Sequence, residues 1–193
     1  MHHKIMTAMA SREAQHRLSG AVQIDDAYLG GERHGGKPGR GSENKVPIVA
    51  AVSLNDAGNP LYLKVAPLAA FSNEALSIWA KANLKPGCTV LSDGLSCFAA
   101  VTEAGCIHQV EVVGQRKPRE LPQFKWVNTV LGNLKTMLSG AYKSFGYAKY
   151  ADRYLGAFAY RFNRRFDLAD LVVRLLADVC RRKPAPERLI RPA

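Results

Sequence analysis

Apolar positions in the first half of the chain fall into short runs separated by turn residues. Residues 46–54 (VPIVAAVSL) form a nearly continuous apolar run, as expected of a strand that is buried on both faces. Residues 55–59 (NDAGN) supply the turn of a hairpin, and residues 60–65 return as its second strand. Other short apolar runs predict three more strands. The five predicted strands are residues 21–25, 46–54, 60–65, 88–92 and 109–113.

Helical spacing dominates the second half of the chain. Trp126, Val130, Leu134 and Leu138 recur near the helical period, which predicts a long amphipathic helix. The predicted helices are residues 4–18, 72–84, 94–104, 124–140, 147–164 and 168–182. This order, with strands first and helices later, predicts an α/β fold: a mixed five-stranded sheet flanked by helices, with a helical C-terminal part.

Charge is the unusual feature of the composition. The 193 residues include 27 Lys and Arg against 16 Asp and Glu, a formal net charge of +11. This excess favours a polyanionic partner, with nucleic acid ahead of a membrane surface. No apolar run approaches the roughly 18 residues of a membrane span, and residues 1–18 lack the apolar core of a signal peptide. We therefore expect one cytoplasmic domain that does not enter a membrane.

Two aspartates and two residues of a later helix are the candidates for chemistry. Asp25 and Asp93 each end a predicted strand. Asn128 lies in the first turns of the predicted helix 124–140, and Lys135 follows one heptad later. A nuclease site with two divalent cations needs oxygen ligands that converge from different elements in this way. Asp26 is an equal alternative to Asp25, because strand alternation directs only one of the pair to a given face.

Each of these residues also has an ordinary structural interpretation. An Asp after a strand is most often a turn or helix-cap residue. An Asn near the start of a helix is usually a cap, and a lone Lys is usually a solvated charge. Spacing alone therefore predicts a basic α/β domain with a suspected metal site.

Several motifs in the same order resemble the catalytic domain of bacterial insertion-sequence transposases of the ISXO type. The resemblance covers about residues 4–168. Its motifs are VQIDDAYLGG at 22–31, VLSDG at 90–94, WVNTVLGNLK at 126–135 and YRFNRRF at 160–166. It implies an RNase H-like fold and DDE-type strand cleavage and transfer on DNA with two Mg²⁺ or Mn²⁺ ions.

The resemblance also assigns residues to this chemistry. Asp25 and Asp93 match the first two catalytic aspartates, and Asn128 matches the third position, where many members carry Glu and a subgroup carries Asn. Lys135 matches a basic residue seven places further along the helix. The rival Asn133 is expected to point away from the Lys135 face. The implied divisions are a linking helix at 1–20, an RNase H-like catalytic domain at 21–168 and a C-terminal helix with a basic tail at 169–193.

Basic residues outside this set are expected to contact the DNA backbone. Each of them is also explained as a charge that aids solubility. They are Arg33, His34, Lys37, Arg40 and Lys45 in a glycine-rich loop, and Arg164 and Arg165 near the last motif. The resemblance further implies a homodimer or a higher synaptic oligomer of the full-length protein.

The chain departs from the family pattern in three places. Lys143 stands where the family usually has His, and Gly156-Ala157 lies where it usually has Glu. Met1 falls in the linking helix, so the resemblance implies a truncated transposase without the zinc ribbon that recognises the element's ends. Two alternatives follow: an inactive remnant that only binds DNA, and a stand-alone RNase H-like nuclease.

Overall fold

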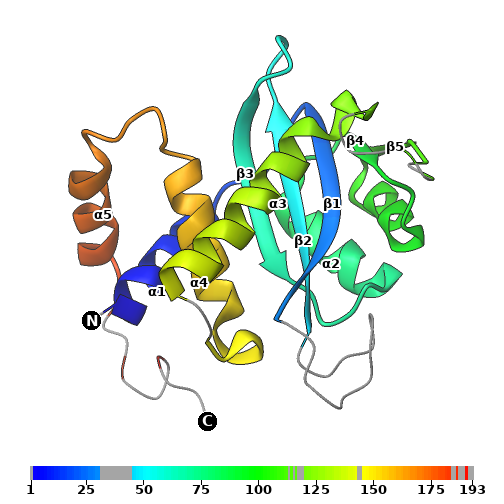
Figure 1. Cartoon of the computed structure of the whole chain (residues 1–193). Helices are drawn as coiled ribbons and strands as arrows, with labels where there is room; N and C mark the ends of the chain where they lie inside the picture. Colours follow the sequence, from blue (N-terminus) through cyan, green and yellow to red (C-terminus); the bar gives the residue numbers. More distant parts are fainter. Residues whose placement is uncertain are drawn as a thin grey trace.

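A five-stranded mixed sheet forms the centre of the computed structural model (Figure 1). The structure describes residues 2–30, 45–112, 114, 116, 120–142, 145–183, 186 and 190. The strands are β1 (Ala21–Leu29), β2 (Val46–Leu54), β3 (Pro60–Pro67), β4 (Thr89–Ser92) and β5 (Ile107–Val110). Their order is β3-β2-β1-β4-β5; β1 is antiparallel to β2 and parallel to β4. The predicted RNase H-like α/β fold is thereby confirmed.

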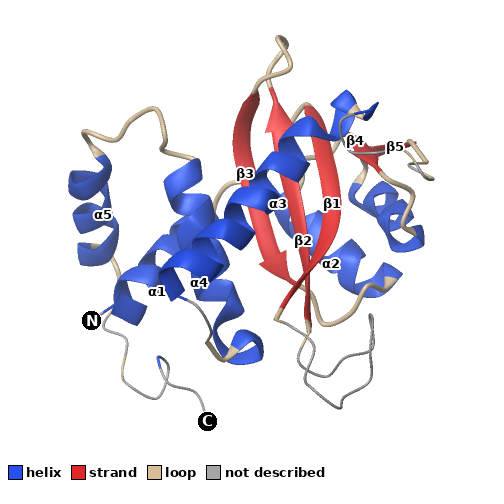
Figure 2. Ribbon diagram, viewed as in Figure 1, coloured by secondary structure: helices blue, strands red, loops and turns tan. Residues whose placement is uncertain are grey.

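Helices cover both faces of this sheet (Figure 2). The α-helices are α1 (His2–Glu13), α2 (Asn73–Asn83), α3 (Lys125–Met137), α4 (Tyr147–Phe162) and α5 (Leu171–Cys180). The 3₁₀ helices η2 (Ser96–Ala104) and η4 (Pro122–Phe124) and the π-helix η5 (Leu138–Tyr142) complete them. One core cluster joins the sheet to α1, α3 and α4, and the other joins it to α2 and η2. Within the described residues no helix is both long and apolar enough to cross a membrane.

Strand alternation assigns the residues of β1 and β2 to the two faces. Ile48 and Val52 pack in the cluster with α3 and α4, whereas Val49 packs in the cluster with α2. On β1, Ile24 faces α2 and Ala27 faces α3. By the same alternation Asp25 lies on the α3 side of β1, and Asp26 on the α2 side.

The largest differences from the predicted elements are at β1 and α1. β1 runs to Leu29 and not to residue 25, because its antiparallel pairing with β2 continues as far as Leu29 opposite Val46. Asp25 and Asp26 therefore lie inside a strand and not at its end. α1 ends at Glu13 because the chain then turns back, and the Leu18 N–H donates to the Asn83 carbonyl. β5 begins two residues earlier than predicted.

α1 and α4 approach each other closely at Gly156. A Cβ atom placed on Gly156 would lie 2.4 Å from Cβ of Ala10, so the crossing requires glycine at this position. The glutamate that the resembled family carries nearby has no room at Gly156 in this packing. α5 in turn contacts α1, so the predicted linking helix and C-terminal helix form one layer with α4.

Candidate active site

A notch opens at the sheet edge where β1 continues past the end of β4. β4 pairs with β1 over only three residues, from Ala21 opposite Thr89 to Gln23 opposite Leu91. β4 ends at Ser92, and Gly94, with φ of 93°, turns the chain away. Among the described residues, the part of β1 after Gln23 has no paired strand on this side. The side chains at this edge are therefore accessible from the end of β4.

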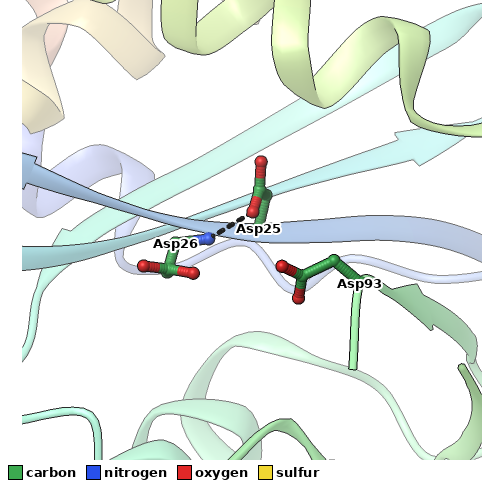
Figure 3. Close-up of side chains that lie close together, drawn as sticks. All are labelled: Asp25, Asp26 and Asp93. Atoms are coloured by element: carbon green, nitrogen blue, oxygen red, sulfur yellow. Dashed lines mark hydrogen bonds between the residues drawn. The ribbon is translucent and has the colours of Figure 1, made fainter. Parts of the chain in front are cut away.

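Three carboxylates meet in the notch (Figure 3). Asp25, Asp26 and Asp93 each offer one oxygen, and these oxygens all lie within 4.8 Å of one another. All three residues are half-buried. The sequence predicts that Asp25 and Asp93 come together and leaves Asp26 as an alternative to Asp25. The structure brings both into the cluster, because at an open strand edge residues of either face can reach a ligand beside it.

Local hydrogen bonds fix two of these carboxylates. Asp25 Oδ1 accepts from the Asp26 backbone N–H at 2.8 Å, and Asp93 Oδ1 accepts from the Leu95 N–H at 3.1 Å. Ser92 also stabilises the turn that carries Asp93. Ser92 Oγ accepts from the Gly94 N–H at 3.3 Å and lies 2.8 Å from Nε2 of His108 on β5.

The electrostatics of the notch disfavour negative charge. Burial, followed by the charges of Asp93 and Asp26, raises the pKa of Asp25 from its ordinary value to about 7. The hydrogen bond from the Asp26 N–H and the charge of Lys135 lower this pKa. A cation bound among the three carboxylates would remove the repulsion between them.

Gln23 fixes the start of α3 over this site. Its Oε1 accepts from the backbone N–H groups of Trp126 and Val127 at 3.1 and 3.0 Å. Gln23 lies two residues before Asp25 on the same face of β1, so the first turn of α3 lies next to Asp25. The N-cap of α3 is Phe124, and Asn128 is the fourth residue of the helix. The alternative interpretation of Asn128 as a helix cap is therefore wrong.

Helical geometry places Asn128 and Lys135 on one edge of α3. At about 100° per residue they lie roughly 20° apart around the helix, whereas Trp126 is on the opposite edge. Trp126 Nε1 donates to the Gly58 carbonyl in the β2–β3 turn at 2.7 Å, so the Asn128 edge faces the β4 side of the sheet. Asn133 shares the edge of Trp126, and it is exposed.

Lys135 borders an open cavity at the far end of β1. The cavity has a volume of about 270 Å³. It is lined by Tyr28, Leu29, Gly30, Lys135, Leu138, Ser139 and Tyr147. Lys135 itself is exposed, so its ammonium group is available to a ligand that enters along β1.

The other predicted DNA contacts differ in their surroundings. Arg33, Lys37 and Arg40 fall outside the described residues. Lys45 directly precedes β2, whose first residue, Val46, pairs with Leu29 at the same end of β1 as the cavity.

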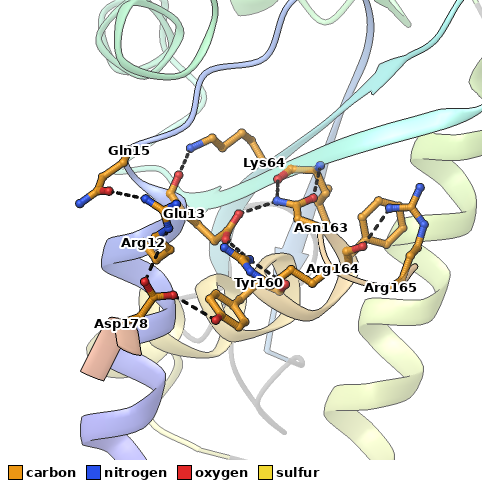
Figure 4. A network of polar contacts seen from close by, with 11 residues as sticks. Arg12, Glu13, Gln15, Lys64, Tyr160, Asn163, Arg164, Arg165 and Asp178 are labelled. Carbon is orange, nitrogen blue, oxygen red and sulfur yellow. Dashed lines mark hydrogen bonds and ion pairs between the residues drawn. The ribbon is translucent and has the colours of Figure 1, made fainter. Parts of the chain in front are cut away.

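Arg164 and Arg165 are engaged within the fold (Figure 4). The Arg164 guanidinium forms an ion pair with Glu13 at 2.5 Å and lies 3.6 Å from the centre of the Tyr160 ring. Arg165 donates to the carbonyls of Pro60 and Leu61 at the edge of β3. These contacts give both guanidinium groups partners within the fold, and their expected contact with DNA stays a prediction.

The donors of the notch fit a hard divalent cation. Mg²⁺ and Mn²⁺ prefer carboxylate and amide oxygens, and the described part of the site supplies three carboxylates within ligand range of one another. Sequence reasoning did not identify Gln23, Ser92 or His108, which hold α3 and the Asp93 turn in place. Gln23 carried a usable signal, because it lies between Val22 and Ile24 and shares the strand face of the candidate ligand Asp25.

One comparison with known proteins matches most of the chain. Residues 17–163 match the family model described as the ISXO2-like transposase domain. The matched segment includes β1, β4 and α3, and therefore the whole notch. No curated protein shows a significant sequence match to this chain.

Proposed function

Because the chain belongs to the ISXO2-like transposase family, we propose that the notch is the catalytic centre of a DDE-type transposase. In this proposal it cleaves DNA at the end of an insertion sequence and transfers that end to a target. The observation that carries the proposal is the convergence of the Asp25, Asp26 and Asp93 oxygens within 4.8 Å of one another. The net charge of +11 supports DNA as the partner.

Asp25 and Asp93 would hold two Mg²⁺ or Mn²⁺ ions, and the amide oxygen of Asn128 would complete the ligand set from α3. When bound, such ions activate a water or a 3′-hydroxyl and neutralise the charge of the leaving oxygen. Asp26 adds negative charge beside these ligands and contributes a further oxygen to the cluster. Asn128 is uncharged, so the site has one negative charge fewer than one with three acidic residues, and DNA phosphates would compensate for it.

Lys135 and Lys45 would bind the DNA backbone next to this centre. Lys135 is exposed, and it is close enough to Asp25 to lower the pKa of that carboxyl group. An ammonium group in this place can bind the phosphate that flanks the scissile bond. Neither contact reads sequence, so we expect the affinity for DNA to fall steeply with salt and to vary little among sequences.

The test is metal-dependent cleavage and joining of DNA. We expect the chain to nick plasmid DNA with Mg²⁺ or Mn²⁺ and to join a 3′-hydroxyl oligonucleotide end to a second DNA. Asp93→Asn should abolish both reactions, because it removes a charged ligand. Asp56→Asn is the matched control, since Asp56 is an exposed aspartate in the β2–β3 turn. Equal activity of wild type and Asp93→Asn would exclude the notch as the catalytic centre.

The same assay separates the alternatives. A stand-alone nuclease would hydrolyse DNA with the same metal requirement but would not join the 3′-hydroxyl end. An inactive remnant would bind DNA in a salt-dependent manner and show no metal-dependent cleavage.

A further inference from the structure

α5 presents a row of aliphatic side chains to solvent. None of its residues is buried, and five aliphatic residues of α5 and the turn before it are between 38% and 68% exposed. We call these five residues the α5 stripe: Leu168, Val172, Val173, Leu176 and Val179. Their spacing places them on one side of the helix. The largest apolar patch on a protein surface is often an interaction surface.

The α5 stripe does not face the helix on which α5 packs. Asp178 of α5 lies 3.7 Å from Arg12 of α1 and accepts from the Tyr160 hydroxyl at 3.0 Å, which fixes the inward side of α5. At about 100° per residue, Val172 and Leu176 lie roughly 120° or more from Asp178 around the helix. α5 stands at one end of the molecule, beside α1 and away from the sheet (Figure 1).

The described part of the C-terminal tail does not return to the α5 stripe. Arg153 of α4 donates to the Ile190 carbonyl, and Ile190 is buried there. Ile190 therefore lies against α4, and the stripe stays exposed among the described residues.

Two features favour a second copy of this chain as the occupant. Asp167 and Asp170 at the start of α5 share one ion-pair partner, Arg174, which leaves a net negative charge there, and Arg181 and Lys183 lie at the other end. Two α5 helices packed antiparallel would place the acidic end of each beside the basic end of the other, as a two-fold axis requires. The five side chains would contribute on the order of 500 Å² per protomer, a large part of the ~800 Å² per partner that is typical of a stable complex.

We propose that the α5 stripe is the self-association surface of this chain, in which two α5 helices pack antiparallel about a two-fold axis. In this arrangement Val172 of one protomer lies opposite Leu176 of the other. The surface is independent of the catalytic proposal, because it lies outside the notch and its test measures oligomeric state and not activity.

Sedimentation velocity of the purified chain over a concentration series tests this surface. We expect wild type to dimerise reversibly and Leu176→Glu to raise the dissociation constant by more than about tenfold, because it buries an unpaired charge. Ile78→Glu is the matched control, since Ile78 is an aliphatic residue of α2 that is 65% exposed. Circular dichroism confirms that both variants are folded. A monomeric wild type, or equal dimerisation of Leu176→Glu and wild type, would overturn the proposal.

Disulfide trapping tests the antiparallel arrangement. In a Cys180→Ser background, we expect a mixture of Val172→Cys and Leu176→Cys chains to form mixed disulfides in preference to either homodimer. Homodimeric disulfides in preference to mixed ones would indicate parallel helices and contradict the proposed axis. A lack of any cross-link in a dimeric sample would place the interface elsewhere and would equally overturn it.

Discussion

One polar cluster lies at the β3 edge of the sheet and the other lies beside β1 past the end of β4, and their charges are arranged in opposite ways. At the β3 edge, Glu13 of α1 meets Arg164, which follows the end of α4, in an ion pair whose side chains are largely buried (Figure 4). Asn163 accepts from the Leu63 N–H through its side-chain oxygen and donates to the Leu63 carbonyl, so its amide pairs with the open edge of β3. Lys64 of β3 donates to the Glu13 carbonyl. We call this cluster the Glu13 network.

The notch at the β1 edge gathers like charges instead. Asp25, Asp26 and Asp93 have oxygens within 4.8 Å of one another, and the pKa of Asp25 is raised to about 7. The Glu13 network matches each donor with an acceptor and so holds α1, β3 and α4 together. The rest of the fold holds the three carboxylates of the notch together against their mutual repulsion. A bound cation would relieve that repulsion. The Glu13 network therefore stabilises the fold, whereas we propose that the notch binds a ligand.

Breaking the Glu13 network should have the largest effect on stability. Glu13→Ala leaves the Arg164 guanidinium without its carboxylate in a largely buried place, and we expect a loss of about 3–5 kcal/mol in the free energy of unfolding. Urea denaturation monitored by circular dichroism measures it. Glu74→Ala, at an exposed residue of α2, is the control and should change stability far less. A loss below 1 kcal/mol (about one hydrogen bond) for Glu13→Ala would contradict the structural role of the network.

Removing one charge from the notch should increase the free energy of unfolding, whereas breaking the Glu13 network decreases it. An unfolded Asp25 releases its proton near pH 4 and the folded one near pH 7, so the stability that this group contributes below pH 4 is lost as the pH rises to about 7. Asp25→Asn should stabilise the metal-free chain by on the order of 2–4 kcal/mol above pH 7. It should also flatten the pH dependence of unfolding between about pH 4 and pH 7.

Denaturation at several pH values with a chelator present measures this change. Asp56→Asn should retain the wild-type slope, because Asp56 is exposed. If Asp25→Asn destabilises the chain at every pH, the three carboxylates of the notch do not repel one another as proposed.

A smaller effect is expected at the turn that presents Asp93. Ser92→Ala removes the hydrogen bonds of Ser92 Oγ with Gly94 and His108, at a cost of about 1–2 kcal/mol. It should also weaken metal binding several-fold, because the Asp93 carboxylate is held less firmly. Ser53→Ala is matched to it, since Ser53 is a buried serine that bonds the backbone of Tyr62. Metal affinities that change equally in both variants would remove Ser92 from a positioning role.

The smallest change in stability is expected at Asn128. Asn128→Ala should alter the free energy of unfolding by only about 0.5 kcal/mol, because the residue lies inside α3 and does not cap it. Its effect on metal binding should be large, and Asn128→Asp should bind Mn²⁺ more tightly by adding a charge. Asn133→Ala, on the opposite edge of the same helix, is the matched control. Equal Mn²⁺ affinity in all four proteins would remove Asn128 from the site.

The sequence predicted the sheet well because its strands are strongly patterned. The run at 46–54 coincides with β2, and the turn 55–59 joins it to β3. The end of β1 was predicted wrongly, since two adjacent aspartates are typical of a turn and the pairing with β2 overrides that local preference. The convergence of Asp25 with Asp93 was predicted from strand ends, although Asp25 lies within its strand.

Contacts between distant segments could not be predicted from local pattern. Asn163 bonds the backbone of Leu63, a hundred residues earlier, and Arg164 pairs with Glu13. Arg164 and Arg165 of the last motif are basic residues, which are equally typical of DNA contacts and of internal ion pairs. The packing beside α1 and the β3 edge shows the internal contacts of both residues, and their contact with DNA stays a prediction.

Direct titration of the metal-free chain with Mn²⁺ by isothermal calorimetry tests the central claim, that the notch is built to bind divalent cations. We predict saturable binding by wild type, a loss of more than about tenfold in affinity for Asp93→Asn, and wild-type affinity for Asp56→Asn. Equal affinity of wild type and Asp93→Asn, or no binding by wild type, would contradict the claim.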